Sequence, residues 1–312
     1  MTDLVTGTAG FIGSHLSARL LDQGRDVVGV DCFTDYYDPA RKRANVASLL
    51  NHPRFRLLEA DLAVDPLEEV VGGAERVFHL AAQPGVRGSW GAGFATYIRQ
   101  NITATQRLLE ALRGTGARIV YASSSSVYGE AEGARTSEET LPRPVSPYGV
   151  TKLTGEQLAL AYVRAAGFDA RAVRYFTVYG PRQRPDMAFS RFIEAARRRD
   201  PIDVYGDGTQ TRDFTFVADA VEATILAGTV DDPGERVFNV GGGSTTSVNG
   251  VIELLGSILG RPLEVRRLPV QPGDVRHTGA DLERTRRVLG WSPRVAFADG
   301  LRAQVDAAVR AS

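Results

Sequence analysis

The sequence predicts an α/β protein built on a doubly wound parallel sheet, with a smaller second domain. Short apolar runs alternate with longer amphipathic stretches from the first residues onward, which is typical of repeated βαβ units. A glycine-rich turn, Gly7–Gly13, stands between the first apolar run and the first amphipathic stretch. Beyond about residue 176 the alternation loosens into arginine-rich segments interrupted by prolines. A large sheet domain followed by a smaller one is therefore expected.

The expected elements follow this alternation in order. We expect strands near residues 3–6, 26–31, 54–60, 75–82, 117–123 and 169–175. We expect helices between them, near residues 13–24, 41–50, 65–72, 93–115 and 146–167. We expect residues 1–176 to form the first domain and 177–312 the second, an α/β domain that lies mainly in 177–212 and 241–312. The two are interleaved, because the apolar segments within 213–240 are expected to return to the first domain.

Composition excludes several functional classes. The 37 basic side chains are balanced by 37 acidic ones, which leaves no electrostatic footprint for nucleic acid or a membrane surface. No apolar stretch approaches the roughly 18 residues of a membrane span, and the chain enters its first strand without a signal-peptide pattern, so we expect a cytoplasmic protein. Cys32 is the only cysteine, and four scattered histidines lack metal-ligand spacing. We expect neither an internal disulfide nor a metal.

The glycine-rich turn predicts a dinucleotide site. Gly7, Gly10 and Gly13 follow the first strand, and Phe11 and Ile12 lie at the start of the helix. Small residues here let the backbone approach a pyrophosphate, and the free N–H groups of a helix N-terminus favour an anion. In this strand–loop–helix context, the turn indicates a Rossmann-type sheet.

Acidic and small residues at the ends of later strands support this site. Asp31 ends the second strand, where a carboxylate would accept hydrogen bonds from ribose hydroxyls. A 2′-phosphate would meet that carboxylate, so NAD is favoured over NADP, although the basic run 41–43 leaves NADP open. Asp61 follows the third strand, where it either contacts the adenine or caps a loop, and Ala81 and Ala82 follow the fourth.

Tyr148 and Lys152 carry the strongest chemical signal. Four residues is about one helical turn, so both side chains leave one face of the helix that Ser146 caps and Pro147 begins. An ammonium beside a phenol favours the phenolate and lowers a pKa that starts at roughly 10. Only two of the 37 basic residues are lysines, so a lysine here suggests a position that arginine cannot fill. YxxxK alone is usually a solvated helix face, but with the glycine turn it indicates a nicotinamide enzyme with a tyrosine base.

Three serines follow the fifth strand at the same edge of the sheet. Ser124, Ser125 and Ser126 precede Val127-Tyr128-Gly129. A hydroxyl at Ser124 or Ser125 would share a proton with a substrate alcohol that also contacts Tyr148; the sequence does not rank the two. Consecutive serines after a strand are otherwise an ordinary polar turn.

Together these motifs resemble the extended short-chain dehydrogenase/reductases of the nucleotide-sugar epimerase and dehydratase family, from about residue 4 to residue 293. The resemblance implies oxidation of a sugar hydroxyl at carbon 4, in which Tyr148 takes the proton and NAD the hydride. It also implies cofactor contacts from Leu62, Gln83, Asn101 and Tyr175. Relatives that dehydrate or decarboxylate commonly carry an acid where this chain has Ser126, so return of the hydride, and thus epimerisation, is favoured.

Other segments resemble the UDP-glucuronate 4-epimerase subgroup, namely 174–187, Asp35–Asp38 and Gln83–Arg87. By this resemblance Thr177 replaces an asparagine of UDP-glucose 4-epimerases. Arg184 would bind the sugar carboxylate, because a guanidinium fork suits it; Ser126 and Arg87 are second choices.

The nucleotide half of the substrate is expected on residues 201–214. A strand and glycine turn there offer backbone groups, around Val204 and Tyr205, for a uracil edge, and Arg212 would take diphosphate charge. The resemblance adds Gln271 and Asp274 as ribose or phosphate contacts, although family members often have arginine where Gln271 stands.

The sequence therefore favours an NAD-dependent UDP-glucuronate 4-epimerase. The alternatives are a UDP-glucuronate decarboxylase, a UDP-glucose 4-epimerase and, from a different class, a dinucleotide-sensing binding protein without catalysis. The helices expected at 93–115 and 146–167 carry apolar residues on more than one face. Burial against the sheet or a homodimer seam would each account for them, and we expect a homodimer.

Overall fold

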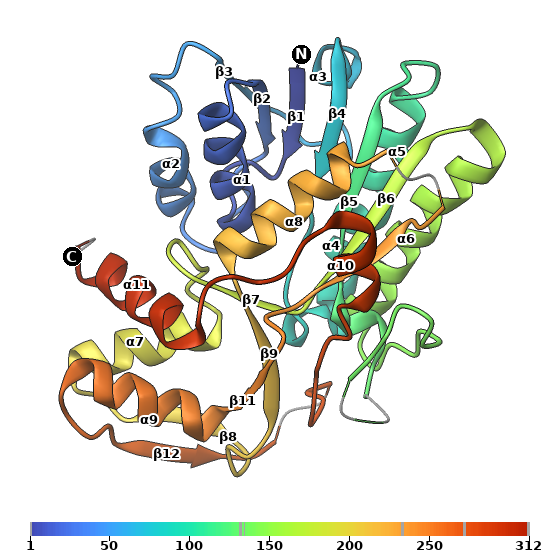
Figure 1. The fold of residues 1–312 in the computed structure, drawn as a ribbon. Helices are drawn as coiled ribbons and strands as arrows, with labels where there is room; N and C mark the ends of the chain where they lie inside the picture. Colours follow the sequence, from blue (N-terminus) through green and yellow to red (C-terminus); the bar gives the residue numbers. More distant parts are fainter. Residues whose placement is uncertain (1, 131–132, 134, 232–233, 271–272, 311–312) are drawn as a thin grey trace.

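The computed structural model describes residues 2–130, 133, 135–231, 234–270 and 273–310. Its largest element is a parallel sheet in the strand order β10-β6-β5-β4-β1-β2-β3 (Figure 1). The strands are β1 (Thr2–Thr6), β2 (Asp26–Asp31), β3 (Phe55–Glu59), β4 (Ala74–His79), β5 (Arg118–Ser124), β6 (Asp169–Tyr175) and β10 (Val237–Val240). The predicted doubly wound parallel sheet is confirmed.

The sheet is buried on both faces because alternate residues of each strand enter different cores. Leu4 and Val5 in β1 are both fully buried, yet they belong to two separate apolar clusters. Helices α1 (Phe11–Asp22), α2 (Pro39–Ala47) and α8 (Val217–Thr229) contribute to the cluster that contains Val5. Helices α3 (Glu68–Val71), α5 (Ala104–Ala111) and α6 (Pro147–Ala166) contribute to the other. Continuous apolar strands are what a sheet with two covered faces requires.

A second group of elements lies below the sheet in Figure 1 and has its own aromatic core. Its strands are β7 (Thr177–Tyr179), β9 (Thr211–Phe216) and β11 (Thr245–Ser247) in one small sheet, and β8 (Ile202–Tyr205) and β12 (Val265–Leu268) in another. Its helices are α7 (Ala188–Arg198), α9 (Val248–Leu259) and α11 (Phe297–Arg310). Between β9 and β11 the chain returns to the large sheet, where β10 pairs with β6; the short helix α10 (Glu283–Leu289) contacts β10.

The single helix expected at 93–115 is wrong in detail. The segment consists of α4 (Phe94–Tyr97), a π-helical segment Ile98–Thr103, and α5. π-Helical turns within α-helices are rare and often mark functional sites. Here the segment carries Asn101, whose side chain bonds to the backbone of Gln83 in the loop after β4. Tertiary hydrogen bonding at Asn101 therefore accompanies the irregular turn, which apolar periodicity alone does not reveal.

Helix α6 begins as the sequence predicted. The Ser146 hydroxyl accepts a hydrogen bond from the Gly149 amide, and Pro147 occupies the first turn. Close contact with β5 depends on Gly155, because a Cβ there would lie 2.2 Å from Tyr121 Oη. The helix ends at Ala166, and Gly167 caps it with a left-handed φ of 67°.

A buried ion pair fixes α6 against β5 and β6. Glu156 and Arg174 are joined by Oε1–Nη2 and Oε2–Nε contacts of 2.5 and 3.0 Å, and the Ser123 hydroxyl donates to Glu156 Oε2 at 2.7 Å. Arg174 Nη1 also donates to Tyr128 Oη at 2.8 Å. Glu156 has no exposed surface, so its charge depends on these partners.

Glu156→Gln should destabilise the protein strongly, because it leaves the Arg174 guanidinium buried without its counter-charge. We expect a loss of about 3–5 kcal/mol in the free energy of unfolding, measured by urea denaturation. The control is Glu194→Gln, since Glu194 makes only exposed pairs with Arg197 and Arg198, each worth about 0–1 kcal/mol. Equal losses in the two variants would contradict the role assigned to the buried pair.

Candidate active site

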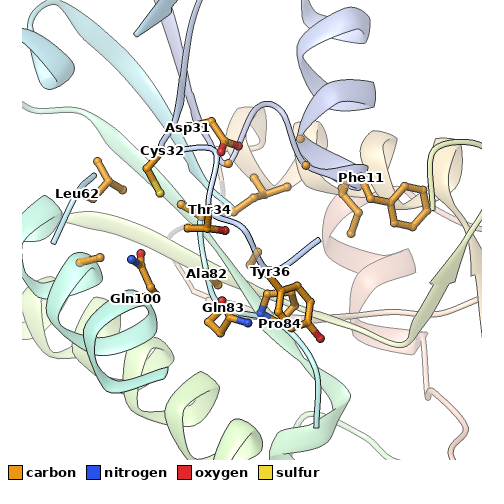
Figure 2. Close-up of a pocket in the computed structure, with 18 of the residues that line it drawn as sticks. Phe11, Asp31, Cys32, Thr34, Tyr36, Leu62, Ala82, Gln83, Pro84 and Gln100 are labelled. Atoms are coloured by element: carbon orange, nitrogen blue, oxygen red, sulfur yellow. The ribbon is translucent and has the colours of Figure 1, made fainter. Parts of the chain in front are cut away.

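A cavity opens at the carboxyl ends of the parallel strands, with walls formed by the loops that follow β1, β2 and β4 and by the start of α6 (Figure 2). The cofactor candidates that line it are Gly7, Gly10, Phe11, Ile12, Gly13, Asp31, Leu62, Ala81, Ala82, Gln83, Tyr148, Lys152 and Tyr175. Ligand sites in doubly wound sheets lie at this edge.

The glycine turn forms a cradle that side chains would fill. A Cβ on Gly13 would lie 2.1 Å from the Gly7 carbonyl oxygen, and a Cβ on Gly7 would lie 2.8 Å from the Ala81 amide nitrogen. Gly7 also has a positive φ of 72°. Gly10 precedes α1 and makes no side-chain cap, so first-turn amides remain for an anion. The cradle fits the pyrophosphate of a dinucleotide.

Asp31 lies at the end of β2 with both carboxylate oxygens oriented by backbone amides. Ala9 N donates to Oδ2 at 3.0 Å and Phe33 N to Oδ1 at 2.9 Å. Burial raises the pKa of Asp31, and these amides together with the Lys42 charge oppose that effect. Each oxygen keeps a lone pair for a ribose hydroxyl, as the sequence suggested.

Lys42, which the sequence indicated only as part of the basic run 41–43, lines the cavity. Its ammonium donates to the carbonyl and hydroxyl oxygens of Thr34, both at 2.8 Å, and lies 5.0 Å from the Tyr37 ring centroid. Lys42 and Thr34 both line the cavity beside Asp31 and Cys32. The scarcity of lysine, which drew attention to Lys152, was an available signal for Lys42 as well.

Tyr148 and Lys152 both face the cavity, and burial opposes the charge on each. The pKa of Lys152 falls to about 7 because the ammonium is desolvated, with Glu156 opposing the shift. Burial raises the pKa of Tyr148; the Arg184 charge and a hydrogen bond with Ser124 oppose that rise, in this order. The sequence predicted that Lys152 lowers the phenol pKa, whereas Arg184 is the cation with the largest such effect in the structure.

The Lys152 ammonium packs against the ring of Tyr121. Its Nζ lies 4.6 Å from the centroid of the Tyr121 ring, a cation–π distance. Ser124 ends β5, and its hydroxyl also accepts from Ser126 N at 3.2 Å, which fixes the start of the serine turn. Ser124, Tyr148 and Lys152 therefore come together through the α6–β5 contact.

Asn101 and Asp61 lie outside the residues that line the cavity. Asn101 Oδ1 accepts from Gln83 N at 2.6 Å, and its amide nitrogen donates to Gln83 O and to Thr151 Oγ1. Thr151 Oγ1 donates in turn to the Tyr148 carbonyl, so Asn101 ties Gln83 to the base of the tyrosine. Asp61 pairs with Arg99 and accepts from Ala63 N, the arrangement of a loop cap.

The proposed sugar contacts come from β7 and the loop after it, and from the turn after β5. Arg184 lines the cavity that contains Tyr148, and its Nε and Nη2 each contact Asp186 at 3.0 Å. Thr177 begins β7, two residues after Tyr175, and Ser126 lies in the turn after β5. Arg184 thus joins the catalytic candidates.

The proposed nucleotide contacts gather at a second place. The Arg87 guanidinium lies 4.0 Å from the Tyr205 ring centroid and donates to Asp274 at 3.1 Å. Arg212 donates to the Val275 carbonyl at 2.5 Å, beside that aspartate. Val204 is buried in the core, which leaves its backbone as the available group. Gln271 lies outside the described residues.

The described residues contain no cluster of three or more His, Cys, Asp or Glu side chains arranged to bind a metal ion. In the same part of the chain, no helix combines the length and apolar character needed to cross a membrane.

Comparison with known proteins agrees with this geometry. The model of the NAD dependent epimerase/dehydratase family matches residues 4–241. A protein of Bacillus subtilis (strain 168) named as an uncharacterized UDP-glucose epimerase is 44% identical over 304 residues, covering 96% of each chain. A UDP-glucuronate 4-epimerase of Thermodesulfobacterium geofontis is 37% identical over 309 residues, covering 97% of this chain and 94% of its own.

A solved structure is similar along the whole chain. It is the UDP-glucuronic acid 4-epimerase from Bacillus cereus in complex with UDP-glucuronic acid and NAD, with a TM-score of 0.97, 42% identity and 100% coverage of both chains. The family model spans more than half of the sequence, and the relatives match nearly all of it. The chain belongs to the NAD dependent epimerase/dehydratase family.

Proposed function

We propose that the protein is a UDP-glucuronate 4-epimerase that interconverts UDP-glucuronate and UDP-galacturonate with a retained NAD. The observation that carries this proposal is Arg184, a cation that lines the same cavity as Tyr148 and Lys152. A neutral sugar would not require that charge, whereas a carboxylate suits the guanidinium fork. The similar Bacillus cereus enzyme, solved with UDP-glucuronic acid and NAD, supports the same substrate class.

The residues present fit NAD. The Gly7–Gly13 cradle and the first turn of α1 would hold the pyrophosphate, and Asp31 would accept from the adenosine ribose. Tyr148 and Lys152 would meet the nicotinamide half. When bound, NAD supplies a hydride acceptor and later a hydride donor.

Tyr148 is the general base of the proposed reaction. Its phenolate takes the proton of the sugar 4-hydroxyl, and the Ser124 hydroxyl donates a hydrogen bond to the phenolate oxygen of Tyr148 and stabilises its charge. The proton returns from Tyr148 when the ketone is reduced on its opposite face. Ser126 stands where a decarboxylating or dehydrating enzyme would place an acid, so the described turn offers no carboxylate for those reactions.

Arg184 protects the intermediate. A 4-keto glucuronate is a β-keto acid, which loses carbon dioxide when its carbon–carbon bond aligns with the carbonyl π system. Arg184 and Thr177 would hold the carboxylate in a rotamer that prevents this alignment. Replacement of these contacts therefore changes the product as well as the rate.

A second candidate is a UDP-glucose 4-epimerase. It is favoured by the name of the 44% identical Bacillus subtilis relative and by Asp186, which already neutralises Arg184. The purified protein should be incubated with UDP-glucuronate without added NAD, and the sugars followed by NMR. UDP-galacturonate at an equilibrium ratio supports the main proposal. UDP-pentose would indicate a decarboxylase, and turnover of UDP-glucose alone would indicate the second candidate.

The wider setting is also a proposal. We propose that the protein is cytoplasmic and that it forms a homodimer. The dimer is supported by Ile98 on the π-helical segment and Val150 on the contacting helix α6, apolar side chains that are 42% and 44% exposed. Residues 1–176 with 213–240 would bind NAD, and 177–212 with 241–312 the nucleotide sugar. Within 213–240, α8 and β10 pack with the large sheet, whereas the end of β9 pairs with β7 and β11 of the second group.

Tyr148→Phe should lower kcat for UDP-glucuronate by about 10²–10⁴-fold, because it removes the proton acceptor and little volume. NMR of the sugar products measures the rate, and the NAD content of the purified variant should equal that of the wild type. Activity close to wild type would show that another group is the base.

Ser124→Ala should shift the acidic limb of the kcat/KM–pH profile upward by about one pH unit. The hydrogen bond from Ser124 lowers the pKa of Tyr148, so its loss raises that pKa, and the phenolate forms only at higher pH. Ser125→Ala is the matched control and should leave the limb in place. A shift with Ser125→Ala alone would reverse the assignment.

Arg184→Lys should increase the share of UDP-pentose among the products. The charge remains but the fork that fixes the carboxylate plane is lost, so we expect a rise of about fivefold or more, equivalent to ~1 kcal/mol. The same change at the exposed Arg41 serves as control. An unchanged product ratio would contradict the protective role.

A further inference from the structure

The guanidinium of Arg184 is already engaged by a neighbouring carboxylate. Its Nε and Nη2 each contact one oxygen of Asp186 at 3.0 Å, in a fork-to-fork pair. The two residues share a tight loop in which Met187 N donates to the Arg184 carbonyl at 3.2 Å. The ion pair is therefore local, and Asp186 stays beside Arg184 wherever this loop lies.

Tyr36 holds the carboxylate from the loop after β2. Its hydroxyl donates to Asp186 Oδ2 at 3.3 Å, and burial raises the pKa of Tyr36 to about 12, so the phenol keeps its proton. The ring packs tightly, since a Cβ on Gly85 would lie 2.6 Å from Tyr36 Oη. Figure 2 shows Tyr36 beside Pro84 and Gln83 in the cavity wall. Asp186 is thus fixed from two loops.

This arrangement leaves one edge of the guanidinium for a ligand. The pair with Asp186 uses the Nε–Nη2 edge, and Nη1 has no hydrogen-bond partner among the described residues. Arg184 lines the cavity together with Tyr148. A carboxylate can bind the Nη1–Nη2 edge in bidentate fashion while Asp186 remains in place.

We propose that Asp186, secured by Tyr36, is a positioning residue that fixes the plane of Arg184 and balances its charge, so that a sugar carboxylate is recognised by orientation more than by net attraction. This inference rests on the proposed function. It adds Asp186 and Tyr36 to the specificity-determining residues, although neither contacts the reacting atoms.

Charge balance and plane have separate consequences. With Asp186 present, the site gains little net charge attraction for an anionic sugar, and the torsion of the bound carboxylate is set by a fixed guanidinium. Asp186→Asn keeps the shape and one acceptor but leaves the Arg184 charge unbalanced. An anionic sugar should then bind more tightly, yet with a less restricted carboxylate.

The first test measures binding in a Tyr148→Phe background, in which turnover is expected to be slowed by about 10²–10⁴-fold. Adding Asp186→Asn should lower the Kd for UDP-glucuronate by about tenfold, while the Kd for UDP-glucose changes less than about twofold, both measured by titration calorimetry. General damage to the site would instead raise the Kd for both ligands. An affinity ratio equal to that of Tyr148→Phe alone overturns the inference.

The second test measures products with Tyr148 intact. Asp186→Asn should raise the UDP-pentose share by about fivefold and Tyr36→Phe by about twofold, as the plane of Arg184 loosens. Asp299→Asn is the matched control, because its ion pair with Arg302 is exposed on α11. The melting temperature and bound NAD of each variant are compared with those of the wild type.

These results separate the two proposals. Wild-type turnover of UDP-glucuronate tests the proposed function alone, whereas the affinity ratio tests the Asp186–Arg184 pair whatever sugar is turned over. If Asp186→Asn does not fold, Tyr36→Phe decides: a wild-type pentose share in that folded variant overturns the inference.

Discussion

The close contact between helix α6 and strand β5 is the constraint on which the site depends. Gly155 lets the helix approach the Tyr121 ring, and the Glu156–Arg174 pair fixes the approach from the other side. One turn earlier the same helix presents Lys152 and Tyr148 to the cavity. Ser124, at the end of β5, meets the phenol only because this contact sets the distance between helix and strand.

The same burial that gives precision also opposes charge. Desolvation lowers the pKa of Lys152 to about 7 and raises that of Tyr148, so burial disfavours the ammonium–phenolate pair. The Arg184 charge opposes the rise at Tyr148, although Arg184 belongs to the loop before α7. A sugar carboxylate that meets Arg184 would therefore also influence the base. In the proposed reaction, recognition and catalysis would therefore share one cation.

Loops far apart in sequence complete the cavity. Tyr36 follows β2, Gly85 follows β4, and Asp186 precedes α7, yet the Tyr36 hydroxyl donates to Asp186 and packs against Gly85. The π-helical segment adds a further link, since Asn101 connects Gln83 with Thr151. These contacts hold the wall between the proposed cofactor and sugar sites without contributing groups to the chemistry.

The sequence by itself determined the parallel sheet, the glycine cradle, and the Tyr148–Lys152 face, because periodicity and one-turn spacing are local properties. It also predicted the Ser146 cap of α6, which the structure confirms. Only the tertiary structure decided three features of the site. Lys42 lines the cavity, Asn101 bonds to the backbone of the cavity residue Gln83, and Asp186 forms an ion pair with Arg184. Those features depend on which loops meet at the edge of the sheet and on burial, which shifts the pKa values of side chains. Neither is encoded in the spacing of residues along one element.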